Sequence, residues 1–180
     1  MRIAELKHEM ELPEGVTAQV EGSTVKIKGP KGEIERKFRA PKFSFGVEGN
    51  NVVVSAKNAT KREKTMGGTL KAHIYNMIKG VTEGHEYKLK ICSGHFPMNV
   101  SLNGDVFTVK NFLGEKIPRT VKIKEGADVK VDGEQVTVSG IDIEIAGQVA
   151  ADIEQLCRIT NRDIRIFQDG IYIIKKPYDA

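Results

Sequence analysis

Two stretches of this sequence decide its fold: EGVTAQVEGSTVKIKG at residues 14–29 and EGADVKVDGEQVTVSG at residues 125–140. When the sequence is shifted by 111 residues, six of the sixteen aligned positions are identical. Apolar residues alternate with polar ones on both sides of an acidic residue followed by glycine, a pattern typical of two strands joined by a tight turn. The sequence therefore predicts an internal repeat, with one such hairpin in each half of the chain.

Each half also contains one segment with the apolar spacing of an amphipathic helix. The first begins with the capping-box pattern at Thr60 to Glu63 and is predicted to end at Gly80. The second begins near Asp142, a residue suited to the N-cap position, and is predicted to end before Arg158. The apolar stripes consist of Met66, Leu70, Ile74, Met77 and Ile78 in the first helix, and of Ile145, Val149, Ile153 and Leu156 in the second.

Alternating apolar and polar residues predict strands at residues 52–55, 86–91, 106–110, 120–124 and 171–175. Because an antiparallel sheet can bury one face and leave the other in water, one helix is enough to cover it. We therefore predict an α+β fold of two tandem homologous domains, each an antiparallel-rich sheet covered on one face by one helix. With the linker expected at Gly80 to Gly84, the domains comprise residues 1–81 and 82–180.

The composition is that of a folded protein with a mildly basic balance. Of 180 residues, 39% are hydrophobic and 29% are charged, and the formal net charge is +4. The chain begins without the apolar run of a signal peptide and contains no long apolar stretch, so we expect a cytoplasmic protein without a membrane span. Cys92 and Cys157 are too few for a disulfide scaffold and are expected to be small buried apolar residues.

Sequence motifs of enzymes and metal sites are missing. There is no nucleophile-elbow G-x-S-x-G, no phosphate-binding G-x-x-x-x-G-K and no G-x-G-x-x-G after a strand. His8-Glu9 begins like a zinc-protease motif, but Leu12 stands where the second histidine is needed. Cys92 and His95 could supply two metal ligands, yet no second pair completes a structural zinc site. We therefore expect no enzyme activity, no metal, no cofactor and no small-molecule substrate.

The charge is distributed unevenly between the two predicted domains. Residues 1–81 contain 15 Lys and Arg against 9 Asp and Glu, whereas residues 82–180 contain 13 against 15. Because cations near phosphate release condensed counterions, the N-terminal domain is by total charge the better candidate for binding nucleic acid. Its basic runs lie at residues 31–42 and 57–64.

Local clustering leads to a different candidate within the C-terminal domain. Its acids gather at residues 128–154, while cations gather at residues 116–124 and toward the end of the chain. Arg158, Arg162 and Arg165 stand out, because guanidinium groups can bind phosphate through two N–H groups and can stack on bases. These three arginines are the strongest RNA-binding candidates that the residues alone provide.

The same region carries a family signature. QLCRITNRDIRIFQDGIYIIKK at residues 155–176, HFP at residues 95–97 and NFLGEK at residues 111–116 resemble the universal large-subunit ribosomal protein family six, in its archaeal and eukaryotic form. The resemblance covers the whole chain and implies a structural role in the large ribosomal subunit of the cytoplasm. It also implies contact with 23S rRNA near the stalk base and the GTPase-stimulating loop, with neighbouring ribosomal proteins at the stalk base as partners.

The resemblance makes the C-terminal domain the principal rRNA-binding domain, against the count of total charge. Cations there would neutralise phosphates, and His95 with Phe96 could approach a sugar or an unstacked base. The expected rRNA-binding residues are His95, Phe96, Lys116, Arg119, Arg158, Arg162, Arg165, Lys175 and Lys176. The residues expected to shape loops are Pro97, Asn111, Gly114, Glu115, Asp169 and Gly170, with Asp169-Gly170 forming a turn.

Alternatives remain at the level of sequence. Phe167 and Tyr172 could stack on bases, but aromatic residues in strand-like segments more often belong to the core. A free-standing RNA-binding or ribosome-assembly module would use the same basic clusters. An enzyme would have to rely on Cys92, His95 or Cys157, for which the sequence shows no third orienting group.

Overall fold

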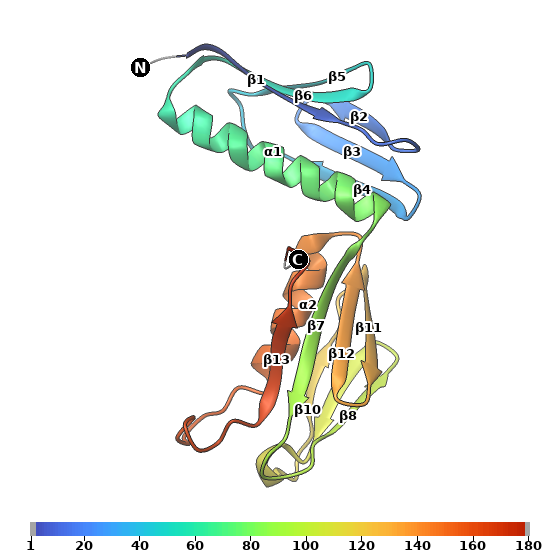
Figure 1. The fold of residues 1–180 in the computed structure, drawn as a ribbon, viewed down its shortest axis with the longest axis vertical. Coiled ribbons are helices and arrows are strands. Elements are labelled where there is room, and N and C mark those ends of the chain that lie inside the picture. The colour runs from blue at the N-terminus through green and yellow to red at the C-terminus, as the bar shows by residue number, and fades with distance from the viewer. Residues whose placement is uncertain (1–2, 179–180) are drawn as a thin grey trace. The chain divides into compact units, whose positions relative to one another are not determined.

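A computed structural model of the chain describes residues 3–178 and divides the chain into two compact units, Met1–Gly84 and His85–Ala180 (Figure 1). Each unit combines antiparallel strands with one long helix, as expected for an α+β protein. The division falls at the end of the predicted linker, because the first long helix continues beyond the residue at which it was expected to stop. We call these parts the N-terminal unit and the C-terminal unit.

The N-terminal unit consists of two three-stranded antiparallel sheets and helix α1 (Lys61–Thr82). Its strands are β1 (Ile3–Glu11), β2 (Thr17–Glu21), β3 (Thr24–Gly29), β4 (Gly32–Lys37), β5 (Ser44–Glu48) and β6 (Asn51–Ala59). The strand orders are β1-β6-β5 and β2-β3-β4, and α1 packs against both sheets. Val25 and Ile27 of β3 and Val54 of β6 are fully buried between the sheets and the helix.

The C-terminal unit also contains two antiparallel sheets, with strand orders β10-β9-β8 and β11-β12-β7-β13. Its elements are β7 (His85–Cys92), β8 (Asn99–Asn103), β9 (Val106–Lys110), the 3-10 turn η1 (Phe112–Gly114), β10 (Arg119–Lys122), β11 (Ala127–Asp132), β12 (Gln135–Gly140), α2 (Ile143–Leu156) and β13 (Gly170–Lys175). Helix α2 packs against β7, β12 and β13. Leu89, Phe107 and Ile153 lie at the centre of this core and are fully buried.

The two units repeat one topology, but not in the register that the sequence suggested. By position in the sheets, β1-β6-β5 corresponds to β7-β12-β11, and β2-β3-β4 corresponds to β8-β9-β10. The quoted stretches form the hairpins β2–β3 and β11–β12, which are therefore not equivalent. The counterpart of β11–β12 is β5–β6. Each unit thus carries two sheets where one was expected, and the predicted alignment of the repeat is wrong.

The physical reason lies in a turn that the fold uses four times. The hairpins β2–β3, β5–β6, β8–β9 and β11–β12 each have a two-residue loop, and glycine occupies its first position. Gly22, Gly49, Gly104 and Gly133 have φ values of 61°, 60°, 60° and 57°. A backbone in this left-handed region favours glycine, so all four hairpins share one sequence pattern. The pattern therefore identifies hairpins, and it does not identify which hairpins are equivalent.

Helix α1 begins as predicted and ends later than predicted. The capping box is confirmed: the backbone N–H of Thr60 donates to Glu63 Oε2 at 3.0 Å, and the Thr60 side chain bonds to the same carboxylate. The helix continues through Gly80 to Thr82, because Gly80 is buried at a helical position and the N–H of Glu83 still bonds to Lys79. Met66 does not belong to the buried stripe, since it is 42% exposed.

Helix α2 agrees with the prediction at both ends. The Asp142 side chain accepts a hydrogen bond from the N–H of Glu144 at 2.8 Å, which confirms the N-cap. Val149 and Ile153 are buried, as are Ala146 and Ala150 on the same face. The predicted strand at residues 120–124 is shorter in the structure, where β10 ends at Lys122.

The two cysteines differ in exposure, and neither forms a disulfide. Cys157 is buried, and burial raises the pKa of its thiol to about 11. Cys92 is only half-buried, so the expectation of full burial is wrong for this residue. Across residues 3–178, no cluster of three or more His, Cys, Asp or Glu side chains could hold a metal ion. Neither helix in that range is long and apolar enough to span a membrane.

Two glycines of the N-terminal unit should respond oppositely to alanine. A Cβ at Gly29 would lie 2.7 Å from Val81 Cγ2 and 2.8 Å from the Val81 carbonyl oxygen, whereas a Cβ at Gly68 meets no atom within 4 Å. We expect Gly29→Ala to destabilise the unit by about 1–3 kcal/mol, because β3 or α1 must shift to make room for the added methyl group. Gly68 is at an exposed position of α1, so Gly68→Ala should stabilise the unit by about 0.5–1 kcal/mol, because alanine favours a helix more than glycine does. Urea unfolding of both variants measures these changes in the free energy of unfolding. Equal changes in the two variants would contradict the packing described for Gly29.

Candidate nucleic-acid interface

Three segments meet at one end of the C-terminal unit, and we call them together the C-terminal loop cluster. They are the loop at residues 93–98, the turn region at residues 111–116 and the segment at residues 158–169. The first and third adjoin paired strands, since Cys92 at the end of β7 is opposite Gly170 at the start of β13. Figure 1 shows these loops leaving the same end of the unit.

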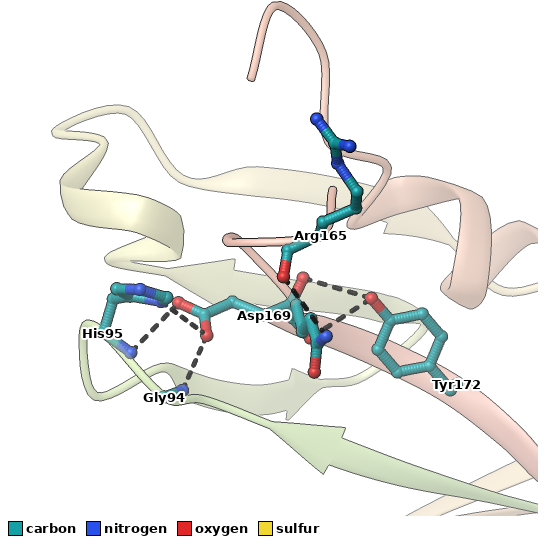
Figure 2. Close-up of polar contacts among 6 residues, drawn as sticks. Gly94, His95, Arg165, Asp169 and Tyr172 are labelled. Atoms are coloured by element: carbon teal, nitrogen blue, oxygen red, sulfur yellow. Dashed lines mark hydrogen bonds and ion pairs between the residues drawn. The ribbon is translucent and has the colours of Figure 1, made fainter. Parts of the chain in front are cut away.

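Asp169 ties the first segment to the third. Its carboxylate accepts hydrogen bonds from the N–H of Gly94 at 2.6 Å and the N–H of His95 at 3.3 Å, and His95 Nδ1 lies 3.3 Å away (Figure 2). The residue is only 2% exposed. Burial raises the pKa of Asp169, but the hydrogen bonds from Gly94 and His95 outweigh that effect and lower the pKa below its ordinary value. The carboxylate therefore stays charged and holds the loop.

The predicted turn at Asp169-Gly170 is wrong. Gly170 is the first residue of β13, is buried and pairs with Cys92. A Cβ at Gly170 would lie 3.0 Å from the ring of Tyr172, which explains the glycine by close packing. The Tyr172 hydroxyl reaches back to donate to the carbonyl oxygen of Gln168 at 3.2 Å.

Two further contacts fix the loop at residues 93–98 from its other side. The side-chain amide of Asn111 donates to the carbonyl oxygen of Pro97 at 3.0 Å. The ring of Phe96 lies 3.5 Å from where a Cβ at Gly114 would be, so glycine leaves room for the phenyl group. Phe96 is nevertheless 42% exposed. Asn111, Gly114 and Asp169 thus hold a loop that presents His95 and Phe96 to solvent.

An aromatic and cationic group lies beside this loop. The rings of His95 and Phe167 are 4.8 Å apart between centroids, and the guanidinium of Arg162 lies 4.9 Å from the centroid of Phe167. Phe167 is half-buried and packs against the core, whereas Tyr172 is 42% exposed. The expectation of a core residue therefore fits Phe167 and is wrong for Tyr172.

The arginines of the third segment are exposed. Arg165 forms a salt bridge with Asp163, with Nη2 at 2.7 Å from Oδ2, and its side chain is 86% exposed. This contact raises the pKa of Arg165 and lowers the pKa of Asp163. Arg158 is also exposed at the start of the segment. The guanidinium groups can therefore reach a ligand without movement of the backbone.

Arg119 has a different environment from the other predicted cations. Its Nη1 donates to the carbonyl oxygens of Leu156 at 2.8 Å and Arg158 at 3.1 Å, while Nε and Nη2 donate to Glu115 at 2.8 and 2.6 Å. Its guanidinium also lies 4.3 Å from the centroid of the Phe112 ring. The hydrogen bonds to Glu115 raise the pKa of Arg119. These contacts connect the turn region to the end of α2.

The remaining predicted cations lie in two places. Lys116 is exposed in the turn region, within the C-terminal loop cluster. Lys175 is at the other end of β13, where it pairs with Lys88 rather than with the end of β7 near Cys92. At roughly 3.3 Å per residue, it lies about 16 Å along the strand from Gly170. The structure therefore does not bring Lys175, or Lys176 after it, into the cluster.

The exposed apolar residues in and beside the cluster were not predicted from the sequence. Ile164 and Ile166 are 69% and 63% exposed, and Ile117, directly after the turn region, is 81% exposed. In the sequence, isoleucines that alternate with charged residues at 162–166 are indistinguishable from a half-buried strand. In the structure this segment is irregular and forms no strand, and both isoleucines face solvent.

Comparison with known proteins gives consistent matches along most of the chain. The model of the family described as ribosomal protein L6 matches residues 12–84 and 96–170. The first matched stretch begins before β2 and the second begins before β8. The chain is similar to proteins named large ribosomal subunit protein uL6 from three archaea. It is 49% identical to that of Methanobrevibacter smithii over 96% of this chain and 97% of the relative. The corresponding values are 45%, 94% and 95% for Haloarcula marismortui, and 47%, 95% and 94% for Methanococcus vannielii.

Proposed function

The chain belongs to the ribosomal protein L6 family, and we propose that it is a structural, non-enzymatic constituent of the large ribosomal subunit whose C-terminal unit binds rRNA. The observation that supports this assignment of the binding surface is the C-terminal loop cluster. Its three segments are up to 75 residues apart in sequence, and hydrogen bonds to one buried carboxylate, Asp169, join two of them. A surface that is fixed in advance loses less conformational entropy on binding.

The chemistry of the cluster suits folded RNA. Arg158, Arg162 and Arg165 can neutralise phosphates and donate paired hydrogen bonds to them. His95 and Phe96 offer exposed ring surface on a fixed loop. RNA-binding proteins commonly read unpaired nucleotides in loops and bulges by stacking on such rings, whereas the deep groove of an RNA helix excludes side chains. We therefore infer that the cluster binds rRNA where the helix is interrupted.

The place that we propose for this contact within the subunit is based on the family resemblance of the sequence. That resemblance favours rRNA at the base of the factor-recruiting stalk and near the loop that stimulates translational GTPases. The partners proposed there are 23S rRNA and the ribosomal proteins that border the stalk base. Lys116 belongs to the same proposed surface, whereas Lys175 and Lys176 would require a second stretch of RNA at the other end of β13.

Removing two arginines tests the proposed surface. We expect Arg162→Ala combined with Arg165→Ala to weaken binding to large-subunit rRNA about tenfold or more at moderate salt. The slope of log affinity against log salt should fall by about two, roughly one for each phosphate that is no longer neutralised. Fluorescence anisotropy across a salt series measures both quantities.

A matched control removes the same charge elsewhere on the C-terminal unit. Lys122 and Lys130 are exposed on β10 and β11 and lie outside the C-terminal loop cluster. The pair Lys122→Ala and Lys130→Ala should leave the slope close to that of the wild type. If the two double variants lose affinity and slope equally, binding depends on total charge and not on the cluster.

A further inference from the structure

The N-terminal unit contains a groove that the proposed rRNA contact does not use. It lies between the segment that precedes β5 and the first turns of α1 and has a volume of about 270 Å³. Its lining includes the apolar side chains of Phe43 and Met66 and the cations Arg39 and Arg62. Met66 is 42% exposed although it stands in a helix whose other methionine, Met77, is buried. An exposed apolar residue beside two arginines is suited to a ligand that has both an apolar and an anionic part.

The charge of the groove is not balanced by the groove itself. Glu63 is its one lining carboxylate among the described residues, and it is 6% exposed. It is already occupied, because it forms a salt bridge with Lys42 at 2.7 Å and closes the capping box with Thr60. Arg39 and Arg62 are exposed, and within residues 3–178 neither guanidinium has a hydrogen bond or ion pair. Two positive charges therefore remain available to an anion.

We propose that this groove binds a nucleotide of single-stranded rRNA, with its base against Met66 and Phe43 and its phosphates between Arg39 and Arg62. The inference rests on the proposed function, since it takes its ligand from the RNA that surrounds a ribosomal protein. The protein would then hold two separate rRNA segments, one with each unit.

The chemistry of the groove suits a nucleotide, and its apolar side chains favour RNA over an acidic peptide. Guanidinium groups bind phosphate through two parallel hydrogen bonds, as they bind carboxylate, so the arginines require an anion without choosing between the two ligands. The thioether of methionine makes favourable contacts with aromatic rings, and every nucleobase presents such a ring. Residues 1–84 contain 15 Lys and Arg against 10 Asp and Glu, so the unit as a whole attracts a polyanion.

Ultraviolet crosslinking of purified large subunits tests the groove directly. After irradiation and digestion, mass spectrometry identifies the peptides of this chain that carry a nucleotide. The inference predicts crosslinks within residues 39–43 or 62–66, in addition to those from the C-terminal loop cluster. In subunits that carry Arg39→Gln with Arg62→Gln, the groove crosslinks should fall about tenfold, since two charge-assisted hydrogen bonds are removed. Crosslinks from the cluster should remain.

A control pair removes charge from the same unit outside the groove. Lys28 and Lys57 are exposed on β3 and β6, and neither lines the groove. Lys28→Gln with Lys57→Gln should leave the groove crosslinks unchanged. Crosslinks from the cluster without any from the groove would overturn this inference and leave the proposed function intact, whereas crosslinks from neither would contradict both. Chemical crosslinks from the groove to an acidic protein segment, without RNA, would likewise overturn it.

Discussion

Asp169→Asn is expected to destabilise the C-terminal unit by about 2 kcal/mol and to lower its melting temperature by about 10 °C. In the wild type both carboxylate oxygens accept hydrogen bonds, one from the N–H of Gly94 and the other from the N–H of His95. Asparagine replaces one of these oxygens with an N–H₂ group. One backbone donor then faces another donor in a position that is 2% exposed, which costs the desolvation of an unpaired group.

Thermal unfolding and amide hydrogen exchange measure the effect. Exchange should accelerate at Gly94 and His95 before it changes in the strands of the unit, because the loop loses its anchor first. Asp128→Asn is the control, since Asp128 is exposed on β11 and has no hydrogen bond or ion pair within the described chain. A melting temperature for Asp169→Asn equal to that of the control would show that Asp169 does not hold the loop.

The stabilities of the wild type and of Asp169→Asn should respond differently to acid. Because the folded-state pKa of Asp169 lies below the ordinary value, its charge stabilises the fold above the unfolded pKa of about 3.9. That contribution disappears as pH falls through the lower, folded-state pKa. The stability difference between wild type and Asp169→Asn should therefore be constant near neutral pH and shrink below about pH 4. A difference that grows as pH falls would have the wrong sign.

Arg119→Ala is expected to cost the C-terminal unit about 3 kcal/mol, the second large effect. The change removes four hydrogen bonds and the contact with the Phe112 ring, and it leaves the carbonyl oxygens of Leu156 and Arg158 without this donor. Arg119→Lys should recover only part of the stability, because an ammonium group lacks the planar fork. Urea unfolding of the two variants gives both values.

Salt dependence separates two roles for Arg119. If it contacts phosphate, as the sequence suggested, its removal should lower the salt slope of rRNA binding by about one. If it positions the segment that carries Arg158 and Arg162, affinity should fall while the slope stays close to wild type. We expect the second result, because its side chain is only 24% exposed and its guanidinium donates to the carbonyl oxygens of Leu156 and Arg158 as well as to Glu115, whereas the Arg165 side chain is 86% exposed. A lower slope for Arg119→Lys would be unexpected in either case, since lysine retains the charge.

The elements of the fold could be predicted more fully than their arrangement. The capping box at Thr60 and the N-cap at Asp142 are local features, so the sequence places the starts of both helices correctly. The assignment of strands to sheets depends on long-range pairing. Four hairpins with one turn chemistry look alike in sequence, and this similarity led to a repeat in the wrong register. The end of α1 was predicted too early, because Gly80 is a buried residue within the helix and does not end it.

The candidate site was predictable in part for similar reasons. The exposed arginines and the loop at residues 95–97 could be named from residue type and family resemblance. The role of Asp169 could not, because its partners Gly94 and His95 stand 74 or more residues away. Arg119 looked like any other basic residue until its acceptors on α2 were known. Roles that arise from contacts between distant segments leave no local signal.

Sedimentation of cell extract through sucrose gradients tests the central claim most directly, with the chain followed by antibody in low and high salt. We predict that the wild-type chain stays with large subunits through the high-salt wash. The variant with Arg162→Ala and Arg165→Ala should be released at lower salt. A wild-type chain that remains at the top of the gradient even in low salt would contradict a structural place in the subunit and would instead support a free RNA-binding or assembly module.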